Sequence, residues 1–314
     1  MDVGQPILDL ALSPDKDKLA FTFGTETTGL KVFGMKEGKT TEFIPATERI
    51  RYPVWSTDSI YLAAWNSGRS NILFDMVTKR RQLEIEASGS AEPNLGKIVF
   101  LSNQPKISYV ENGSLYEMEY TGGKKVKIVD GVSPTSPHYY SMDSRFVVFH
   151  NSSNQLMLFN KSTGSIQMLA ESDSGNPFGR VVAFAGDKPT LVYYNGGSSG
   201  NQFYSYNANN GSGEPFFKNR QTVLPFTSML ANKSRQKLLV VEGGFDTYTV
   251  GGVREAYCPY TQLSYDYGYF APELWSPDGQ FVLSPKTAKI AGLNNCSLSG
   301  EFVSEIPDQV IWLK

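Results

Sequence analysis

Residues 272–283 read P-E-L-W-S-P-D-G-Q-F-V-L and have the pattern of a β-hairpin. An apolar run is followed by a turn, and a second apolar run begins at Phe281. Pro277 favours the φ angle of a turn, the Asp278 side chain can bond the backbone two residues further on, and Gly279 adopts a positive φ without steric cost. The stretch therefore predicts two antiparallel strands joined by a tight turn.

The same hairpin pattern recurs along the chain at a nearly constant spacing. Residues 53–64 read P-V-W-S-T-D-S-I-Y-L-A-A, residues 12–21 read L-S-P-D-K-D-K-L-A-F, and less regular turns complete the series. The turn markers are Asp15, Asp58, Gln104, Asp143, Asp187, Ser234 and Asp278, which are separated by 43, 46, 39, 44, 47 and 44 residues. A period of this kind predicts a repeat protein.

Each repeat contains short apolar runs separated by turns, which predicts a sheet of four antiparallel strands. Repeats of about 40 to 45 residues with this content are typical of β-propeller blades. A single sheet cannot bury both of its faces, so neighbouring sheets must pack on one another around an axis. We expect an all-β fold, with one seven-bladed β-propeller domain over residues 1–314. The expected blades are residues 6–48, 49–87, 95–131, 132–171, 178–218, 222–268 and 270–314.

The end of the chain leaves two alternatives open. Residues 309–314 read Q-V-I-W-L-K, like the first strand of a further blade. Either this strand closes the ring by pairing into the first blade, or the propeller is cut short of an eighth blade. Closure matters because an open ring exposes strand edges.

One family resemblance can be named from the turn pattern. The pattern P-x-W-S-P-D-G-x-x-[LIV]-[AV]-F is nearly complete at residues 272–282 and partial at residues 53–64 and 13–21. It resembles the WD-repeat-like β-propeller repeats of the TolB family, which also build the propeller domains of prolyl oligopeptidase and dipeptidyl peptidase relatives. The Gly-His and Trp-Asp dipeptides of true WD repeats are absent from the sequence. The resemblance implies a propeller fold and a bacterial periplasmic or extracellular setting rather than a cytoplasmic one.

Charge and hydropathy argue against two classes of partner. The chain has 29 basic and 31 acidic residues, a formal net charge of −2, and no basic run longer than the one at residues 79–81. This balance does not favour binding to nucleic acid. No apolar stretch approaches the roughly 20 residues that cross a bilayer, so we expect no membrane span in this chain.

Few residues could carry metal or redox chemistry. Cys258 and Cys296 allow either one disulfide between neighbouring repeats or two unpaired thiols. His138 and Tyr139 are expected on the first strand of the fourth blade, which faces the channel of a propeller, so they are candidate ligand contacts. The alternative is that His138 is a structural residue among aromatic side chains. A metal site needs three or four ligands, and we predict no metal and no cofactor.

No arrangement of residues predicts a catalytic site. The G-S-S-G stretch at residues 197–200 does not fit the G-x-S-x-G nucleophile elbow, so the chain carries no peptidase domain of the kind found in its propeller relatives. Asp15, Asp58, Asp143 and Asp278 lie in turns, where their carboxylates are expected to accept backbone amides rather than to form a cluster.

The strongest binding candidate is an aromatic stretch. Residues 257–270 read Y-C-P-Y-T-Q-L-S-Y-D-Y-G-Y-F. Tyrosine on a rigid scaffold offers a large contact area at low entropic cost. The alternative is a pair of strands whose tyrosines pack between blades. The predicted contact residues are Tyr260, Tyr265, Tyr267, Tyr269 and Phe270.

These observations favour a non-enzymatic platform that binds a protein or a peptide, such as the extracytoplasmic sensor or docking domain of a bacterial envelope protein. The alternative is an enzyme that works in the channel of the propeller, or the accessory propeller domain of a hydrolase or peptidase.

Overall fold

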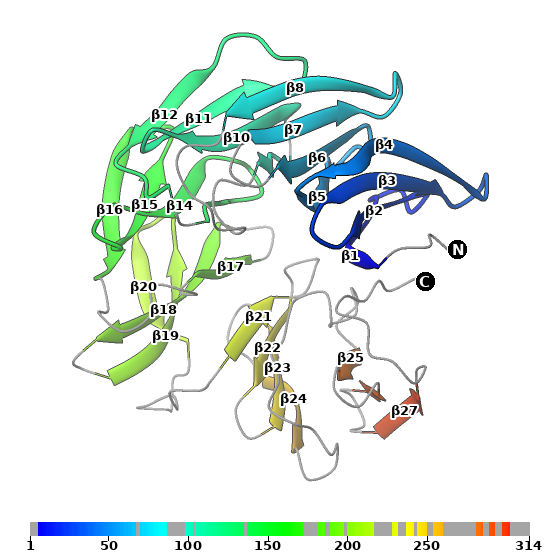
Figure 1. The fold of residues 1–314 in the computed structure, drawn as a ribbon. Coiled ribbons are helices and arrows are strands. Elements are labelled where there is room, and N and C mark those ends of the chain that lie inside the picture. The colour runs from blue at the N-terminus through cyan, green and yellow to red at the C-terminus, as the bar shows by residue number, and fades with distance from the viewer. Residues whose placement is uncertain are drawn as a thin grey trace. The chain divides into compact units, whose positions relative to one another are not determined.

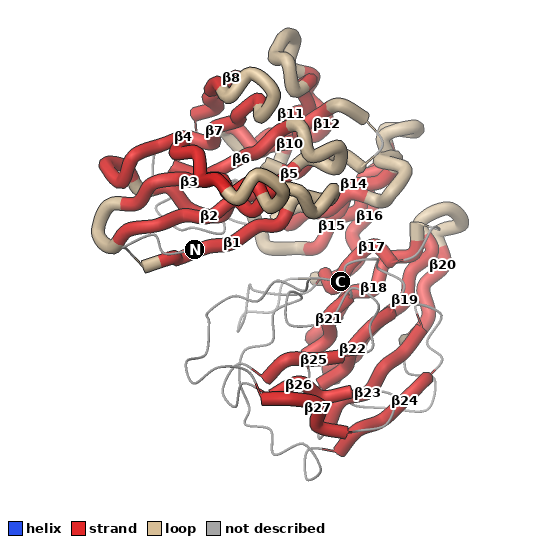
Figure 2. The backbone as a smooth tube through the Cα atoms, turned by 90° about the vertical axis from the view of Figure 1, so that its right-hand side faces the viewer, coloured by secondary structure: helices blue, strands red, loops and turns tan. Residues whose placement is uncertain are grey.

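The computed structural model of the chain consists of β-strands joined by turns, and every regular element among its described residues is a strand (Figure 2). The described residues are 6–66, 70–86, 98–102, 104–134, 137–171, 181–185, 189–197, 200–216, 228–231, 237–241, 244–249, 254–259, 281–284, 289–292 and 297–301. The chain divides into two compact units, Met1–Tyr140 with Val147–Gln167, and Ser141–Phe146 with Met168–Lys314.

The first unit contains three four-stranded antiparallel sheets, which follow one another along the chain (Figure 1). The first sheet is β1 (Ile7–Leu12), β2 (Lys18–Gly24), β3 (Thr28–Gly34) and β4 (Lys39–Glu48). The second is β5 (Ile50–Trp55), β6 (Tyr61–Asn66), β7 (Ser70–Asp75) and β8 (Arg80–Glu86). The third is β9 (Val99–Phe100), β10 (Lys106–Glu111), β11 (Ser114–Glu119) and β12 (Val126–Asp130). In each sheet the strands lie in chain order.

A fourth sheet has residues in both units, and the remaining sheets belong to the second unit. The fourth sheet is β13 (Tyr139–Tyr140), β14 (Phe146–His150), β15 (Leu156–Asn160) and β16 (Ser165–Ala170). The fifth is β17 (Val181–Ala185), β18 (Thr190–Gly197), β19 (Gly200–Asn207) and β20 (Ser212–Pro215). The sixth is β21 (Ser228–Ala231), β22 (Lys237–Val241), β23 (Gly244–Thr249) and β24 (Arg254–Pro259). The seventh is described as three strands, β25 (Phe281–Ser284), β26 (Lys289–Gly292) and β27 (Ser297–Glu301).

The expected all-β class and the four-stranded antiparallel repeat are therefore confirmed where the chain is described. The strand and turn expected at residues 272–279 lie outside the described residues, as do residues 309–314. The number of blades and their union in a single domain stay predictions.

Three of the predicted hairpin turns share one pattern of hydrogen bonds, which we name the serine–aspartate turn. Before β6, Ser56 Oγ donates to Asp58 Oδ1 at 2.5 Å and accepts the Tyr61 N–H at 2.8 Å. Asp58 Oδ1 also accepts the Ile60 N–H at 3.0 Å. The equivalent contacts form at Ser13 with Asp15 and at Ser141 with Asp143. The prediction that these aspartates bond backbone amides in turns is confirmed.

The residue after each of these aspartates has a left-handed backbone. Lys16, Ser59 and Ser144 have φ angles of 62°, 61° and 57°. The pattern at residues 272–283 places Gly279 at this position. A side chain with a β-carbon carries a steric cost there that glycine does not.

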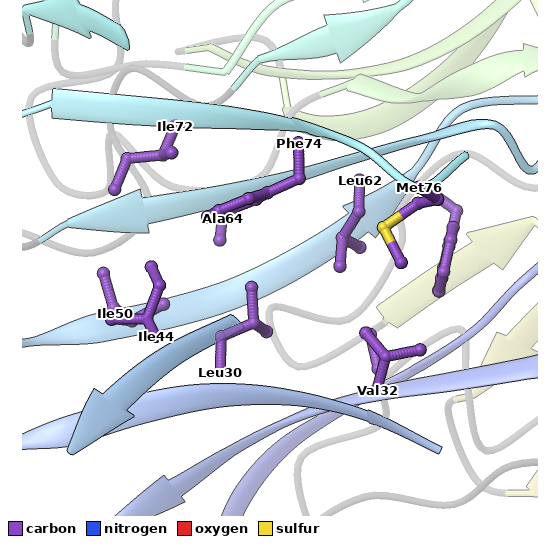
Figure 3. Packing of buried hydrophobic residues seen from close by; sticks show 11 residues of the cluster. Leu30, Val32, Ile44, Ile50, Leu62, Ala64, Ile72, Phe74 and Met76 are labelled. Carbon is purple, nitrogen blue, oxygen red and sulfur yellow. The ribbon is translucent and has the colours of Figure 1, made fainter. Parts of the chain in front are cut away.

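The second sheet is buried on both faces. Leu62 and Ala64 of β6 pack against Leu30 of the first sheet (Figure 3). Ala63, between them in sequence, packs instead with Ile107 of the third sheet. Alternate residues of a strand point to opposite faces, so one apolar run supplies two cores. This packing confirms, for the first unit, the expectation that neighbouring repeats cover the faces of each other's sheets.

A buried charge joins the first two sheets. Asp9 on β1 is only 2% exposed, and it accepts hydrogen bonds from Thr22 Oγ1 at 2.6 Å and Arg51 Nε at 2.7 Å. It also accepts the backbone N–H of Tyr52 at 3.2 Å. The hydrogen bond to Asp9 raises the pKa of Arg51 above its ordinary value. A carboxylate removed from water needs such partners, because an unpaired buried charge strongly destabilises a fold.

Lys16→Gly is expected to raise the free energy of unfolding by roughly 0.5 kcal/mol, because glycine relieves the left-handed strain at an exposed position. Ser59→Gly is the contrasting control. Ser59 is buried and its Oγ accepts the Asp15 N–H at 3.0 Å, so this change is expected to cost about 1 kcal/mol. Urea unfolding measures both effects, and equal losses in the two variants would show that the turn at Lys16 is unstrained.

Candidate functional site

A cluster of polar side chains lies in the packed layer between the third and fourth sheets. Ser108 on β10 and Glu117 on β11 are direct partners in the antiparallel register, so they share one face of the third sheet. The same face carries Val110 and Leu115, which pack with Tyr140 of the fourth sheet. Strand alternation therefore directs the Ser108 and Glu117 side chains toward β13.

His138, just before β13, is buried against this cluster. Its Nε2 lies 3.1 Å from Ser108 Oγ, and its ring meets the Tyr140 ring edge to face at 6.0 Å. His138 is 5% exposed, and burial lowers the pKa of its imidazole to about 4. The side chain is therefore neutral at pH 7 and can make one donor and one acceptor contact.

Tyr140 connects the serine to the carboxylate. Its hydroxyl oxygen lies 3.1 Å from Ser108 Oγ and 3.0 Å from Glu117 Oε1. Tyrosine has a single proton to donate, and an ionised carboxylate is the stronger acceptor of the two. Burial and the nearby Glu117 charge raise the pKa of Tyr140 well above its ordinary value, so the phenol keeps its proton.

Lys161 supplies the opposite charge. Its ammonium group forms an ion pair with Glu117 Oε1 and lies 5.5 Å from the centre of the Tyr140 ring. Glu117 is 4% exposed and the Lys161 side chain is 20% exposed. Lys161 directly follows β15, so the fourth sheet brings a cation to the carboxylate of the third.

The cluster pairs a serine with a histidine, but its geometry is not that of a nucleophile and its base. Ser108 is fully buried. A substrate would have to open the layer between two sheets to reach its hydroxyl. The contacts instead connect β10, β11, β13 and the end of β15 through charged and neutral hydrogen bonds. These hydrogen bonds fix how the third and fourth sheets pack.

The structure tests only part of the predicted site. His138 and Tyr139 are described. His138 has the buried, bonded geometry of the structural alternative, and its role as a ligand contact stays a prediction. Cys258 lies on β24 with its backbone opposite Phe245, and the predicted disulfide stays a prediction because Cys296 is outside the described residues. Also outside are Tyr260, Tyr265, Tyr267, Tyr269 and Phe270.

Sequence reasoning missed Ser108, Glu117 and Lys161. A signal for two of them exists in the strands. Ser108 alternates with Val110, and Glu117 alternates with Leu115, so a polar residue occupies an apolar-face position in each strand. In a sheet covered on both faces, such a residue must find a partner in the neighbouring sheet.

Two further properties concern the described ranges alone. No group of three or more His, Cys, Asp or Glu side chains in these ranges is arranged to hold a metal ion. No helix with the length and apolar character of a membrane span occurs among the described residues.

Comparisons with known proteins place the chain by its fold. No protein-family model matches the sequence, and no curated protein matches it. An oligogalacturonate lyase from Vibrio parahaemolyticus is 12% identical, with a TM-score of 0.56 over 90% of this chain and 84% of that chain. A chain from a structure of the Mitotic Checkpoint Complex is 13% identical, with a TM-score of 0.56 over 92% of this chain and 84% of that chain.

Two other solved structures are similar to the chain. An oligogalacturonate lyase in complex with manganese is 12% identical, with a TM-score of 0.55 over 90% of this chain and 84% of that chain. TolB from Acinetobacter baumannii is 16% identical, with a TM-score of 0.46 over 80% of this chain and 64% of that chain. This TM-score is too low to support a conclusion about the fold. The lyases are β-propellers, so the likeness shows the β-propeller fold alone. Membership of the TolB repeat family stays a prediction.

Burial of neutral His138 predicts a specific dependence of stability on pH. The unfolded imidazole takes up a proton near pH 6.5 and the folded one only near pH 4, so stability is complete above pH 6.5 and falls as the pH drops to 4. The loss is about 3 kcal/mol over this interval. The His138→Gln variant should not show this loss of stability between pH 6.5 and pH 4. Denaturant unfolding of both proteins between pH 7 and 4.5 measures the difference, and parallel stability curves would contradict the assignment.

Lys161→Met is expected to lower the free energy of unfolding by about 3 kcal/mol, because it leaves the Glu117 carboxylate buried without its cation. Adding Glu117→Gln should restore most of the loss, since glutamine carries no charge and still accepts from Tyr140. Lys125→Met is the matched control, because Lys125 forms a solvent-exposed ion pair with Glu111, and exposed pairs contribute little to stability. Equal losses in Lys161→Met and Lys125→Met would contradict the structural role of the cluster.

Proposed function

We propose that the chain is a seven-bladed β-propeller that binds a protein or peptide partner and has no catalytic activity of its own. Support for the architecture comes from six four-stranded sheets and one three-stranded sheet among the described residues, and from the likeness to propellers of similar length. The seven turn markers, spaced by 39 to 47 residues, support one blade for each sheet.

The observation that carries the non-enzymatic proposal is the burial of the Ser108–His138–Tyr140 cluster. A propeller enzyme that used His138 would have to present the imidazole to its substrate. Here the imidazole is 5% exposed and contacts a fully buried serine. The imidazole of His138 and the phenol of Tyr140, which are the groups best suited to proton transfer in this part of the chain, therefore stabilise the packing of two sheets.

The proposed contact surface is the aromatic stretch at residues 257–270. Tyr265, Tyr267 and Tyr269 alternate there with Asp266 and Gly268. Neighbouring tyrosines of this set are thus separated by a single residue in the sequence. Tyrosine is enriched among the residues that dominate binding energy, because its ring is large and has few rotatable bonds.

The proposed cellular setting rests on the resemblance of the turn pattern to TolB-family repeats. It favours a bacterial periplasmic or extracellular location, where a propeller would serve as a sensor or docking domain. The likeness to oligogalacturonate lyases is at 12% identity and concerns the fold, so it does not support lyase activity for this chain.

The binding proposal is tested by capture of partners on the immobilised, folded chain. Changing Tyr265, Tyr267 and Tyr269 together to alanine is expected to reduce recovery of a saturable partner at least 10-fold, since single hot-spot side chains contribute 2 kcal/mol or more. The control is a triple alanine variant of exposed apolar residues on β12 and β16, the last strands of their sheets. Its positions are Val126, Ile166 and Met168.

Three outcomes separate the parts of this proposal. A loss confined to the tyrosine variant supports it. Equal recovery by all three proteins would remove the aromatic stretch from the proposed surface. If the unmodified chain captures no saturable partner, the binding function itself is contradicted.

A further inference from the structure

Three large side chains meet where β5 begins and β6 ends. Arg51 and Trp65 are direct partners in the antiparallel register, so their side chains share one face of the second sheet. The Arg51 guanidinium lies 5.1 Å from the centre of the Tyr52 ring, and that ring lies 6.4 Å from the ring of Trp65. A cation, a phenol and an indole are thus held within one small region.

The backbone at this point is in an unusual conformation. Tyr52 has a φ of 53°, and the register of β5 shifts between Arg51 and Val54. A bulky residue in the left-handed region is a strained arrangement that persists only when surrounding contacts hold it. Asp9 provides one such contact by accepting the Tyr52 N–H. Strained backbone of this kind is concentrated at functional sites.

Arg51 uses only part of its hydrogen-bonding capacity. A guanidinium has five N–H donors. Arg51 Nε donates to Asp9 Oδ2 at 2.7 Å, and Nη2 donates to Asp9 Oδ1 at 3.4 Å. Within the described part of the chain, the three other donors, two of them on Nη1, have no partner. The side chain as a whole is 35% exposed.

Trp65 adds a second donor without a partner. Its Nε1–H is buried and has no hydrogen-bond acceptor among the described residues. Trp55, on the same sheet, shows the usual arrangement, because its Nε1–H donates to the Ala11 carbonyl at 2.8 Å. A buried donor that lacks an acceptor is destabilising and is rare in folded proteins. Such a donor directly across the strand pair from a partly used guanidinium indicates a missing acceptor.

We propose that Arg51 and Trp65 form a binding site for the carboxylate group of a ligand. A carboxylate has two acceptor oxygens and a negative charge, which match the free donors of a guanidinium and an indole. Asp9 already binds the other side of Arg51 in this manner. The carboxylate of Glu48, at the end of β4, accepts a hydrogen bond from the side-chain amide of Asn66 at 2.6 Å.

The inference deepens the proposed function, since it rests on peptide binding for the source of the carboxylate: an acidic side chain or a free carboxyl terminus of the bound segment. Its chemical test is independent of any partner. Failure of partner capture would leave the carboxylate site standing, and failure of the carboxylate test would leave partner capture standing.

The test follows the indole N–H signals of the ¹⁵N-labelled full chain by NMR. The chain has four tryptophans, and Trp65→Phe assigns the signal of interest. The probes are Ac-Ala-Glu-Ala-NH2, which has only a side-chain carboxylate, Ac-Ala-Ala-Ala-OH, which has only a terminal one, and Ac-Ala-Gln-Ala-NH2, which has neither. Sodium chloride at equal ionic strength controls for salt.

At least one carboxylate probe is expected to shift the Trp65 signal downfield in a saturable manner, with a dissociation constant on the order of 1 mM for so small a ligand. The Trp55 signal should not move, because its donor is already bonded to Ala11. Which of the two acidic probes acts identifies the source of the carboxylate. The amide probe and sodium chloride should have no saturable effect.

Variants separate recognition from folding. Trp65→Phe removes the indole N–H signal, so binding to this variant is followed through the Arg51 Nε–H signal. Trp65→Phe keeps an aromatic ring but removes the donor, and it is expected to weaken the active probe at least 5-fold. The matched variant Trp55→Phe removes a bonded indole N–H from the same sheet and should leave the affinity unchanged. A Trp65 signal that no carboxylate probe moves, or equal affinities in both variants, would overturn the proposal.

Discussion

The rest of the structure depends on sheets that are apolar on both faces. In β6, Leu62 and Ala64 enter one core while Ala63 enters another. A four-stranded sheet with this pattern is stable only when a neighbour covers each face, because either face alone would expose apolar surface to water. Each repeat therefore requires the next one. In the first unit, this requirement holds the second sheet between the first and the third.

Two-sided burial also decides what polar residues can do. Asp9 is bonded to Arg51 of the second sheet, and Glu117 of the third sheet is bonded to Tyr140 and Lys161 of the fourth. In both cases a carboxylate in the packed layer is paired with a cation from the next sheet. Such pairs contribute little net stability compared with apolar packing, but breaking one is costly. They therefore restrict which sheets pack together and in what register, and they explain why groups capable of chemistry are buried here.

Local patterns predicted the hairpins because the turn is fixed by residues close in sequence. Asp15, Asp58 and Asp143 accept backbone amides as expected. The role of the serine hydroxyl, which bonds both the aspartate and the chain five residues on, was not foreseen. The left-handed position tolerates Lys16 where the best repeat has glycine, since the hydrogen bonds of the turn hold it.

The candidate site was harder to predict because its residues meet only through packing. Ser108 and Lys161 are 53 positions apart, and nothing local relates them. His138 stood out by rarity, and its surroundings became visible only when the third and fourth sheets were in place. Likewise, Arg51 and Trp65 become a pair only through the register of β5 with β6. The aromatic stretch at residues 257–270 stays an expectation from composition.

The central proposal is that seven such sheets stack around one axis. An experimentally determined structure of the whole chain at side-chain resolution tests it most directly. We expect seven four-stranded sheets in a ring, with the seventh completed by residues 272–275 and with Ser276 Oγ bonded to Asp278 as in the other serine–aspartate turns. Two sheets packed face to face, or a seventh repeat without that turn, would contradict the account.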